Sequence, residues 1–166
     1  MKKFIEKIRN ICEKNVKVAM FIDMDGTINE YAVYSDESVV KKMEDNYSNV
    51  EPVTPIIETL KEINEFPNID LYILSLSKTK KISEEKDRWL EKYVEFIPRK
   101  NWIVLTKENG NYNSENRDII KPIKMKEKLE EYNHVILLDD DHKILRKSIE
   151  MLQDRIDAFH ITSVLI

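Results

Sequence analysis

Two carboxylates, Asp23 and Asp25, stand one residue apart directly after the apolar run 18–22 and are followed by Gly26 and Thr27. A short apolar run closed by a turn is typical of a buried parallel strand, and open α/β sheets carry their chemistry at the carboxyl ends of such strands. Side chains at positions i and i+2 of an extended chain share a face, so both carboxylates can enter one cleft unless the turn rotates Asp25 away. Two anions this close to an apolar sheet need a cation, and a hard divalent metal is the best candidate.

Polar side chains of other types follow two more expected strands. Ser75 ends a strand expected over 69–74, and the acidic triplet 139–141 ends a strand expected over 134–138. Lys121 heads the helix that precedes this second strand. Each of these residues also has an ordinary structural interpretation: Ser75 as a strand-end hydroxyl, the acidic triplet as a helix cap and Lys121 as a surface lysine. Asp-x-Asp-Gly-Thr can likewise be a simple turn. Together they supply the nucleophile, proton donor, metal ligands, hydroxyl and fixed cation that phosphoryl transfer requires.

Hydrophobic spacing predicts the elements that position these residues. Strands are expected over 17–22, 69–74, 102–105, 134–138 and 158–165, and helices over about 2–14, from Thr54, from Ser83, over 121–132 and after the acidic triplet. This alternation predicts an α/β fold with a mostly parallel five-stranded sheet, helices on both faces and right-handed crossovers. We expect a single domain over 1–166, in which 28–50 is a small polar insert with a short helix from Ser35.

Composition excludes several classes of function. Charged residues of both signs make up 35% of the chain, and the net charge of −4 gives no strong basic surface for a nucleic-acid backbone. The sequence predicts no transmembrane helix, and charged residues interrupt any signal-peptide core near the N-terminus. The single cysteine, Cys12, is expected to pack on an apolar helix face, and it favours a reducing, cytoplasmic location. With Gly26 and Gly110 as its only glycines, the chain has no Walker loop and no dinucleotide fingerprint.

The sequence Phe-Ile-Asp-Met-Asp-Gly-Thr at 21–27 resembles the first signature of the haloacid dehalogenase (HAD) superfamily of phosphotransferases. The chain order Asp, Ser, Lys, Asp also matches the four motifs of that superfamily. The resemblance implies a three-layer Rossmann-like core, a nucleophile at Asp23, a general acid/base at Asp25 and bound Mg²⁺. An acid at Asp25 argues against a dehalogenase, because a halide leaving group needs no proton.

Segments 51–55, 62–67, 73–75 and 85–90 look like the 5'(3')-deoxyribonucleotidase branch of the superfamily, also called the 5'-nucleotidase C type. This likeness implies that Ser75, Lys121 and Thr27 bind the substrate phosphate. It also implies that Asp23, the backbone carbonyl of Asp25, and Asp140 bind the metal, with Asp139 supporting or sharing the site.

The chain departs from that branch at two points. The branch has a larger helical cap that grips the base, whereas residues 28–50 leave room for only a minimal flap. Tyr31, Tyr34 and Tyr47 can stack on a base, but we prefer the interpretation that they pack the flap onto the domain. The usual Thr-x-x-Lys follows the third strand directly, which makes Lys107 a rival of Lys121. We favour Lys121, because a helix start can deliver its ammonium to the cleft.

These observations predict a cytoplasmic, magnesium-dependent phosphatase that acts through an aspartyl-phosphate, with a 5'-nucleotidase-like activity on (deoxy)nucleoside monophosphates as the preferred hypothesis. The expected partner is a small phosphorylated substrate, with no membrane contact. The sequence leaves open whether the protein forms a homo-oligomer in which a second subunit covers the cleft. One alternative is a HAD phosphatase for a nucleic-acid end, a phosphoprotein or another metabolite. The other is a non-catalytic HAD-fold binding module, which Asp23, Asp25 and Asp140 argue against, since each carboxylate costs stability without a metal.

Overall fold

The computed structural model describes residues 1–31 and 47–166, which fold around one five-stranded sheet. The sheet order is β3-β2-β1-β4-β5, and all neighbours are parallel. The strands are β1 (Val18–Ile22), β2 (Ile69–Ser77), β3 (Trp102–Thr106), β4 (His134–Asp139) and β5 (Ile156–His160). In the central strand, Ile22 pairs with Ile73 of β2 and with Leu138 of β4. The residues that follow β1 therefore lie between these two neighbouring strands.

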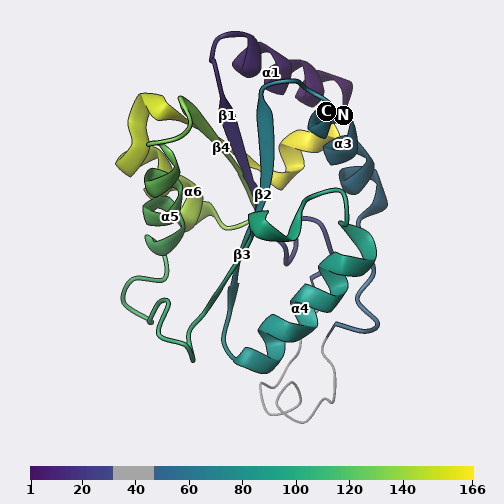
Figure 1. Ribbon diagram of the computed structural model, residues 1–166, viewed down its shortest axis with the longest axis vertical. Helices are drawn as coiled ribbons and strands as arrows, with labels where there is room; N and C mark the ends of the chain where they lie inside the picture. The colour runs from purple at the N-terminus through teal and green to yellow at the C-terminus, as the bar shows by residue number, and fades with distance from the viewer. Residues whose placement is uncertain (32–46) are drawn as a thin grey trace.

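Helices cover both faces of the sheet (Figure 1). One face carries α1 (Lys2–Glu13), α3 (Thr54–Asn64) and α4 (Lys80–Tyr93), and the other carries α5 (Ile120–Lys128) and α6 (His142–Leu152). Alternating side chains of β1 serve the two cores: Met20 and Ile22 pack with the first set of helices, and Phe21 packs with the second. A strand buried on both faces is apolar throughout, as β1 is. The predicted α/β fold is confirmed.

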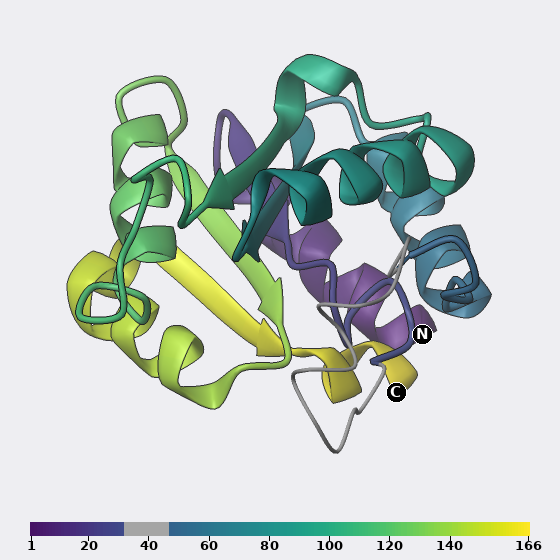
Figure 2. The same ribbon diagram turned by 90° about the horizontal axis from the view of Figure 1, so that it is seen from below.

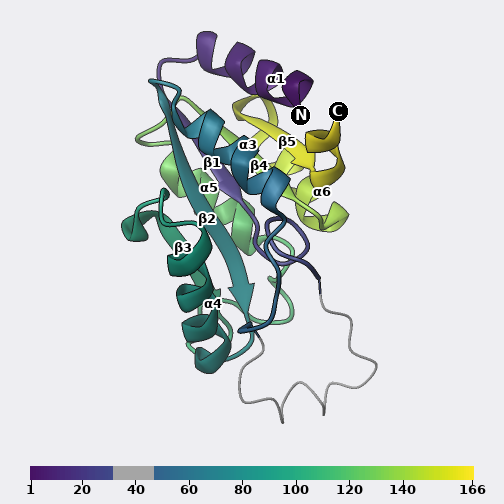
Figure 3. The same ribbon diagram turned by 90° about the vertical axis from the view of Figure 1, so that its right-hand side faces the viewer.

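The carboxyl ends of the strands and the chain termini lie at opposite ends of the molecule. The arrowhead of β2 points to the lower end in Figure 3, and Figure 2 looks onto that end from below. Both termini lie at the upper end, where the Met1 ammonium donates to the carbonyl oxygen of Ile166. The end that carries Asp23 is therefore remote from the paired termini.

Several predicted boundaries were wrong. Strand β2 continues to Ser77, because Ser75 still pairs with Val104 of β3, so Ser75 lies inside the strand. Helix α4 begins at Lys80 and not at Ser83, because the Thr79 hydroxyl accepts a hydrogen bond from the Ile82 amide and caps the helix.

Two elements nearer the C-terminus are shorter than predicted. Helix α5 ends at Lys128 and is followed by turns over 129–131. The last strand, β5, ends at His160 and not at Leu165, because its partner β4 ends at Asp139, directly opposite His160. Without a partner, residues Ile161–Leu165 form a 3-10 helix whose Val164 packs into the core.

The insert 28–50 is described only at its two ends, which are tied together. The Val53 amide donates to the Ile28 carbonyl at 2.8 Å, and the Glu30 amide donates to the Glu51 carbonyl at 3.0 Å. The helix predicted from Ser35 and the side chain of Tyr34 lie outside the described residues. Every helix within 1–31 and 47–166 falls short of the length and apolarity that a membrane crossing needs.

Candidate active site

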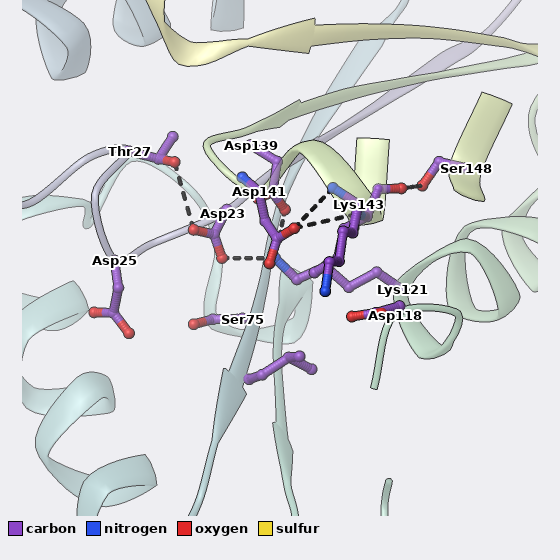
Figure 4. Close-up of polar contacts among 12 residues, drawn as sticks. Asp23, Asp25, Thr27, Ser75, Asp118, Lys121, Asp139, Asp141, Lys143 and Ser148 are labelled. Carbon is purple, nitrogen blue, oxygen red and sulfur yellow. Dashed lines mark hydrogen bonds and ion pairs between the residues drawn. The ribbon is translucent and has the colours of Figure 1, made fainter. Parts of the chain in front are cut away.

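Asp23 is fixed at the end of β1 by backbone and side-chain contacts. Its amide donates to the Leu138 carbonyl at 2.9 Å, which extends the β1–β4 ladder by one residue. Its Oδ1 accepts from Lys121 Nζ at 2.6 Å and its Oδ2 from the Thr27 hydroxyl at 3.4 Å (Figure 4). Burial raises the pKa of Asp23 to about 6, although Lys121 opposes the rise. The carboxylate is thus held in one orientation and is costly to ionise in the absence of a further cation.

Lys121 is the lysine that reaches Asp23. It lies in the first turn of α5, is 2% exposed, and also donates to Asp139 Oδ2 at 2.6 Å. Burial alone would lower the pKa of Lys121, but Asp23 and Asp139 raise it above its ordinary value. Lys107, the rival from the sequence, points to the Ser114 hydroxyl at 2.7 Å on the exposed loop. An ammonium has three N–H donors, and Lys121 uses two of them on carboxylates of the described residues.

Three carboxylates form a compact acidic cluster. Asp23, Asp139 and Asp140 each offer an oxygen, and these oxygens all lie within 4.8 Å of one another. Burial and the neighbouring Asp23 raise the pKa of Asp140. Gly26 has φ +78°, and a Cβ on it would lie 2.7 Å from Asp140 Oδ2, so the turn after β1 closes tightly on this carboxylate. A hard divalent cation fits this set of oxygen donors and would relieve the repulsion among them.

The acidic triplet divides between two tasks. Asp139 and Asp140 belong to the cluster, whereas Asp141 caps α6 by accepting from the Lys143 and Ile144 amides. Burial would raise the pKa of Asp141, but its ion pair with Arg117 at 3.0 Å and the amide hydrogen bonds hold it below its usual value. The helix-cap interpretation therefore holds for one of the three aspartates.

Asp25 enters the same pocket but is bound by a different lysine. Its Oδ2 accepts from Lys86 Nζ at 2.7 Å, and its Oδ1 accepts from the Tyr47 hydroxyl at 2.8 Å and from Asn29 Nδ2 at 3.3 Å. Burial would raise the pKa of Asp25, but Lys86, Tyr47 and Asn29 hold it below its usual value. In Figure 4 the Asp25 side chain lies on the side of Asp23 away from Lys121. Its carboxylate is not part of the three-carboxylate cluster.

Lys86 is a site residue to which the sequence analysis gave no role. It lies on α4, is 1% exposed, and donates to Ser75 Oγ at 2.8 Å and to the Leu76 carbonyl at 2.7 Å as well as to Asp25. A signal was present in the sequence, because Lys86 precedes Trp89 by three residues and Leu90 by four. That spacing places it on the buried face of the helix.

These side chains line a pocket of about 460 Å³ at the carboxyl ends of the strands. The pocket wall holds Asp23, Asp25, Ser75, Lys86, Lys121, Asp139, Asp140 and Asp141, together with Tyr31, Tyr47, Tyr112, Lys78, Arg117 and several apolar residues. Tyr31 is 66% exposed, whereas Tyr47 packs against the core as it lines the pocket. Thr27 is fully buried, and its hydroxyl donates to Asp23. The contact predicted between Thr27 and the substrate phosphate stays a prediction.

No family model and no curated protein matches this sequence. Among solved structures, the fold is similar to the HAD domain of effector protein Lem4 from Legionella pneumophila, with a TM-score of 0.54 and 16% sequence identity over 87% of this chain and 86% of that chain. A structure of an inactive mutant of the same domain gives a TM-score of 0.55 at 16% identity, over 87% of this chain and 85% of that one. The chain therefore has a HAD-type fold, and the likeness to the nucleotidase branch stays a prediction.

Proposed function

We propose that this protein is a magnesium-dependent phosphomonoesterase in which Asp23 is the nucleophile. The observation that carries the proposal is the cluster of Asp23, Asp139 and Asp140 around the end of the central strand, with Lys121 bound to two of its members. A HAD-type fold supports the same chemistry by analogy. Side chains suited to each part of the reaction line one pocket: two carboxylates for the nucleophile and the proton donor, further carboxylates for a metal, a hydroxyl and a fixed cation.

The proposed reaction has two displacements at phosphorus. In the first, an oxygen of Asp23 bonds to phosphorus, the ester bond breaks, and the leaving oxygen takes a proton from Asp25. In the second, water attacks the aspartyl-phosphate and gives a proton to Asp25, which releases inorganic phosphate and restores Asp23. Asp25 is ionised in the resting site. A phosphate dianion bound beside it raises its pKa, because like charges favour the protonated form, so Asp25 takes up a proton from solvent when the substrate binds and returns it when inorganic phosphate leaves.

The remaining residues orient these groups. Thr27 holds Asp23, and the third N–H of Lys121 can donate to a phosphate oxygen while the other two keep Asp23 and Asp139 in place. Ser75 binds a further phosphate oxygen. Mg²⁺ would be held by Asp23 and Asp140, with Asp139 beside them and the backbone carbonyl of Asp25 as a further ligand. When bound, it would supply positive charge that lowers anion repulsion at the phosphate.

We further propose that the substrate is a small phosphomonoester with an aromatic group, and a (deoxy)nucleoside monophosphate is the preferred candidate. The pocket volume of about 460 Å³ is in the range of small-molecule sites. Tyr31, Tyr47 and Tyr112 line the pocket, and Tyr31, which is 66% exposed, offers a ring on which a base can stack. The same ring would accept the aryl group of another phosphoester, so substrate trials must include both kinds.

The direct test is a panel of phosphoesters assayed with Mg²⁺ and with a chelator. We expect turnover of deoxynucleoside monophosphates and of p-nitrophenyl phosphate, loss of turnover with the chelator, and loss in Asp23→Asn. Activity on the aryl ester but on no nucleotide would overturn the nucleotidase proposal alone. Full activity of Asp23→Asn would overturn the proposed mechanism.

A thermal melt separates an enzyme from a binding module without a metal site. We expect Mg²⁺ together with a fluoride mimic of phosphate to raise the melting temperature of the wild type, because both ligands bind only the folded state. Asp140→Asn is the matched control, since it removes one charge from the cluster and should reduce the shift. A wild type that shows neither a shift nor turnover would contradict the proposed function.

A further inference from the structure

We infer that Lys86 is a positioning residue that orients Asp25 and Ser75 together and makes no contact with the substrate. This inference deepens the proposed phosphatase function and rests on it. The general acid/base and the phosphate-binding hydroxyl would then depend on one buried ammonium that comes from the opposite face of the sheet to Lys121.

The hydrogen-bond count of Lys86 shows that its ammonium is saturated. Its three N–H donors go to Asp25 Oδ2 at 2.7 Å, Ser75 Oγ at 2.8 Å and the Leu76 carbonyl at 2.7 Å. The side chain is 1% exposed. Lys86 therefore has no donor left for a phosphate oxygen, in contrast to Lys121, which uses two donors on carboxylates of the described residues.

The contact with Lys86 fixes the direction in which Ser75 donates. A serine hydroxyl has a single hydrogen, and an ammonium can only donate, so Ser75 Oγ must accept from Lys86. Its own O–H therefore points elsewhere, and the pocket that Ser75 lines is where a phosphate oxygen can receive it. Lys86 thus prepares Ser75 as a donor before the substrate arrives, which reduces the reorganisation that the reaction needs.

The contact with Asp25 fixes the plane of the second carboxylate. Lys86 holds Oδ2, while Oδ1 is held by Asn29, in the turn after β1, and by Tyr47, near the end of the insert. A carboxylate held at both oxygens cannot rotate about its last bond without losing a hydrogen bond. Proton transfer depends on such placement, because a donor must lie within hydrogen-bond reach of the leaving oxygen.

Helix α4 is anchored so that Lys86 stays at this point. Its cap, Thr79, comes two residues after the end of β2, so the strand that carries Ser75 leads directly into the helix that carries Lys86. One turn further along, Trp89 is buried in the core, and its indole N–H donates to the Val50 carbonyl at 2.9 Å. The ammonium is thereby fixed with respect to both Ser75 and the returning end of the insert.

The test compares two esters that differ in how much they need a proton on the leaving oxygen. Phenyl phosphate releases a basic phenolate, whereas p-nitrophenyl phosphate releases a stabilised one, and the two esters differ only in the nitro group. For Lys86→Met we expect kcat/KM to fall about 100-fold on phenyl phosphate, in line with the usual contribution of a positioned acid. On the p-nitrophenyl ester we expect a reduction of about tenfold or smaller. We expect KM to rise by the same small factor on both esters, because Ser75 loses its orientation toward the phosphate whichever phenolate leaves.

Two further measurements guard against misfolding of the variant. Lys86→Ala leaves a space for ethylammonium, and we expect this amine to restore part of the lost rate on phenyl phosphate but to leave the wild type unchanged. The matched control is Lys92→Met, on the exposed side of the same helix, for which we expect wild-type rates. Melting curves of all variants show whether each is folded at the assay temperature.

The outcomes separate the two proposals. Equal losses of kcat/KM on both esters, a rise in KM alone, or no rescue of a folded Lys86→Ala would overturn the inference and leave the phosphatase proposal standing. A wild type that hydrolyses no phosphoester would overturn both.

Discussion

The site has two halves, each built around one buried lysine, and they differ in charge balance. The Lys121 half holds Asp23, Asp139 and Asp140, and the Lys86 half holds Asp25 and Ser75. Lys121 faces two almost completely buried carboxylates, Asp23 and Asp139, whose side chains are 10% and 1% exposed. Lys86 faces Asp25, which is 32% exposed and also accepts hydrogen bonds from Tyr47 and Asn29. One half therefore has more buried negative charge than its lysine neutralises, and the other is balanced by its own partners.

This difference identifies where a cation is needed. With Asp140 beside them, the carboxylates of the Lys121 half outnumber their single buried lysine, and burial raises the pKa of both Asp23 and Asp140. In the Lys86 half the pKa of Asp25 is lowered. We therefore expect a metal to bind the carboxylates of the Lys121 half and to lower their pKa values. The Lys86 half should keep its geometry with or without the metal.

The largest expected effect comes from removing each lysine in turn. Lys121→Met leaves two buried carboxylates without their partner, so we expect the free energy of unfolding at pH 7 to fall by about 3–5 kcal/mol. Lys86→Met leaves Asp25 partly exposed and still bound by two donors, so we expect a loss of about 1–3 kcal/mol. Urea denaturation of the metal-free proteins measures both. A greater loss for Lys86→Met would reverse the comparison.

A methyl group at Gly26 tests how tightly the two halves are joined. Gly26→Ala puts a Cβ on a residue with φ +78°, and that Cβ would lie 2.7 Å from Asp140 Oδ2. Because the backbone is strained and Asp140 must move, we expect the free energy of unfolding to fall by about 2 kcal/mol. Magnesium affinity, measured by calorimetry, should fall as well. Gly110→Ala is the matched control, because Gly110 has the same φ and no neighbour within 4 Å of the added Cβ. Equal magnesium affinity in both variants would show that Gly26 does not support the cluster.

The two halves should also differ in their response to pH. The pKa of Asp23 is about 6 in the fold against a usual value of 3.8, so the folded metal-free protein binds this proton more tightly than the unfolded chain. The stabilisation from that proton is therefore lost as the pH rises through about 4 to 6. Because a metal needs the ionised carboxylate, we expect the Kd for Mg²⁺ to fall about tenfold between pH 5 and pH 7. A Kd that is constant over this range would contradict the assignment of Asp23 to the metal.

The smallest effect is expected from the hydroxyl of Tyr47. Tyr47→Phe removes one of the donors to Asp25 and leaves the ring in place, so we expect a loss of about 1 kcal/mol of stability. Lys86 remains on the other oxygen, and magnesium affinity should be unchanged. Denaturation and calorimetry on the same sample check both points. A large drop in magnesium affinity would mean that the halves are not independent.

The Lys121 half was largely predictable from the sequence, because its residues stand at ends of elements that hydrophobic patterning identifies. Asp23 and the acidic triplet follow strongly apolar strands, and Lys121 opens a helix. The sequence favoured Lys121 over Lys107 on the argument that a helix start can deliver its ammonium to the cleft, but it did not show how the loop 107–119 folds back. The structure brings Lys121 to Asp23 and leaves Lys107 on the surface.

In the Lys86 half the sequence identified Asp25 and Ser75 but missed Lys86 itself, because this residue stands in a run of charged side chains. Residues 84–88 contain five charged side chains in succession, which reads as a solvated helix face. The helix start was also placed at Ser83, three residues too late, although the predicted helix did contain Lys86. The contact of Tyr47 with Asp25 depends on the path of the insert, and neither spacing nor composition encodes that path.

The central claim is that Asp23 forms a covalent bond to phosphorus. Wild-type enzyme is mixed with p-nitrophenyl phosphate and Mg²⁺, quenched in acid before steady state, and digested, and the peptide that contains Asp23 is analysed by mass spectrometry. We expect one added phosphoryl group, located at Asp23 by fragmentation and absent from Asp23→Asn. Turnover without this adduct, or an adduct on a different residue, would contradict the account.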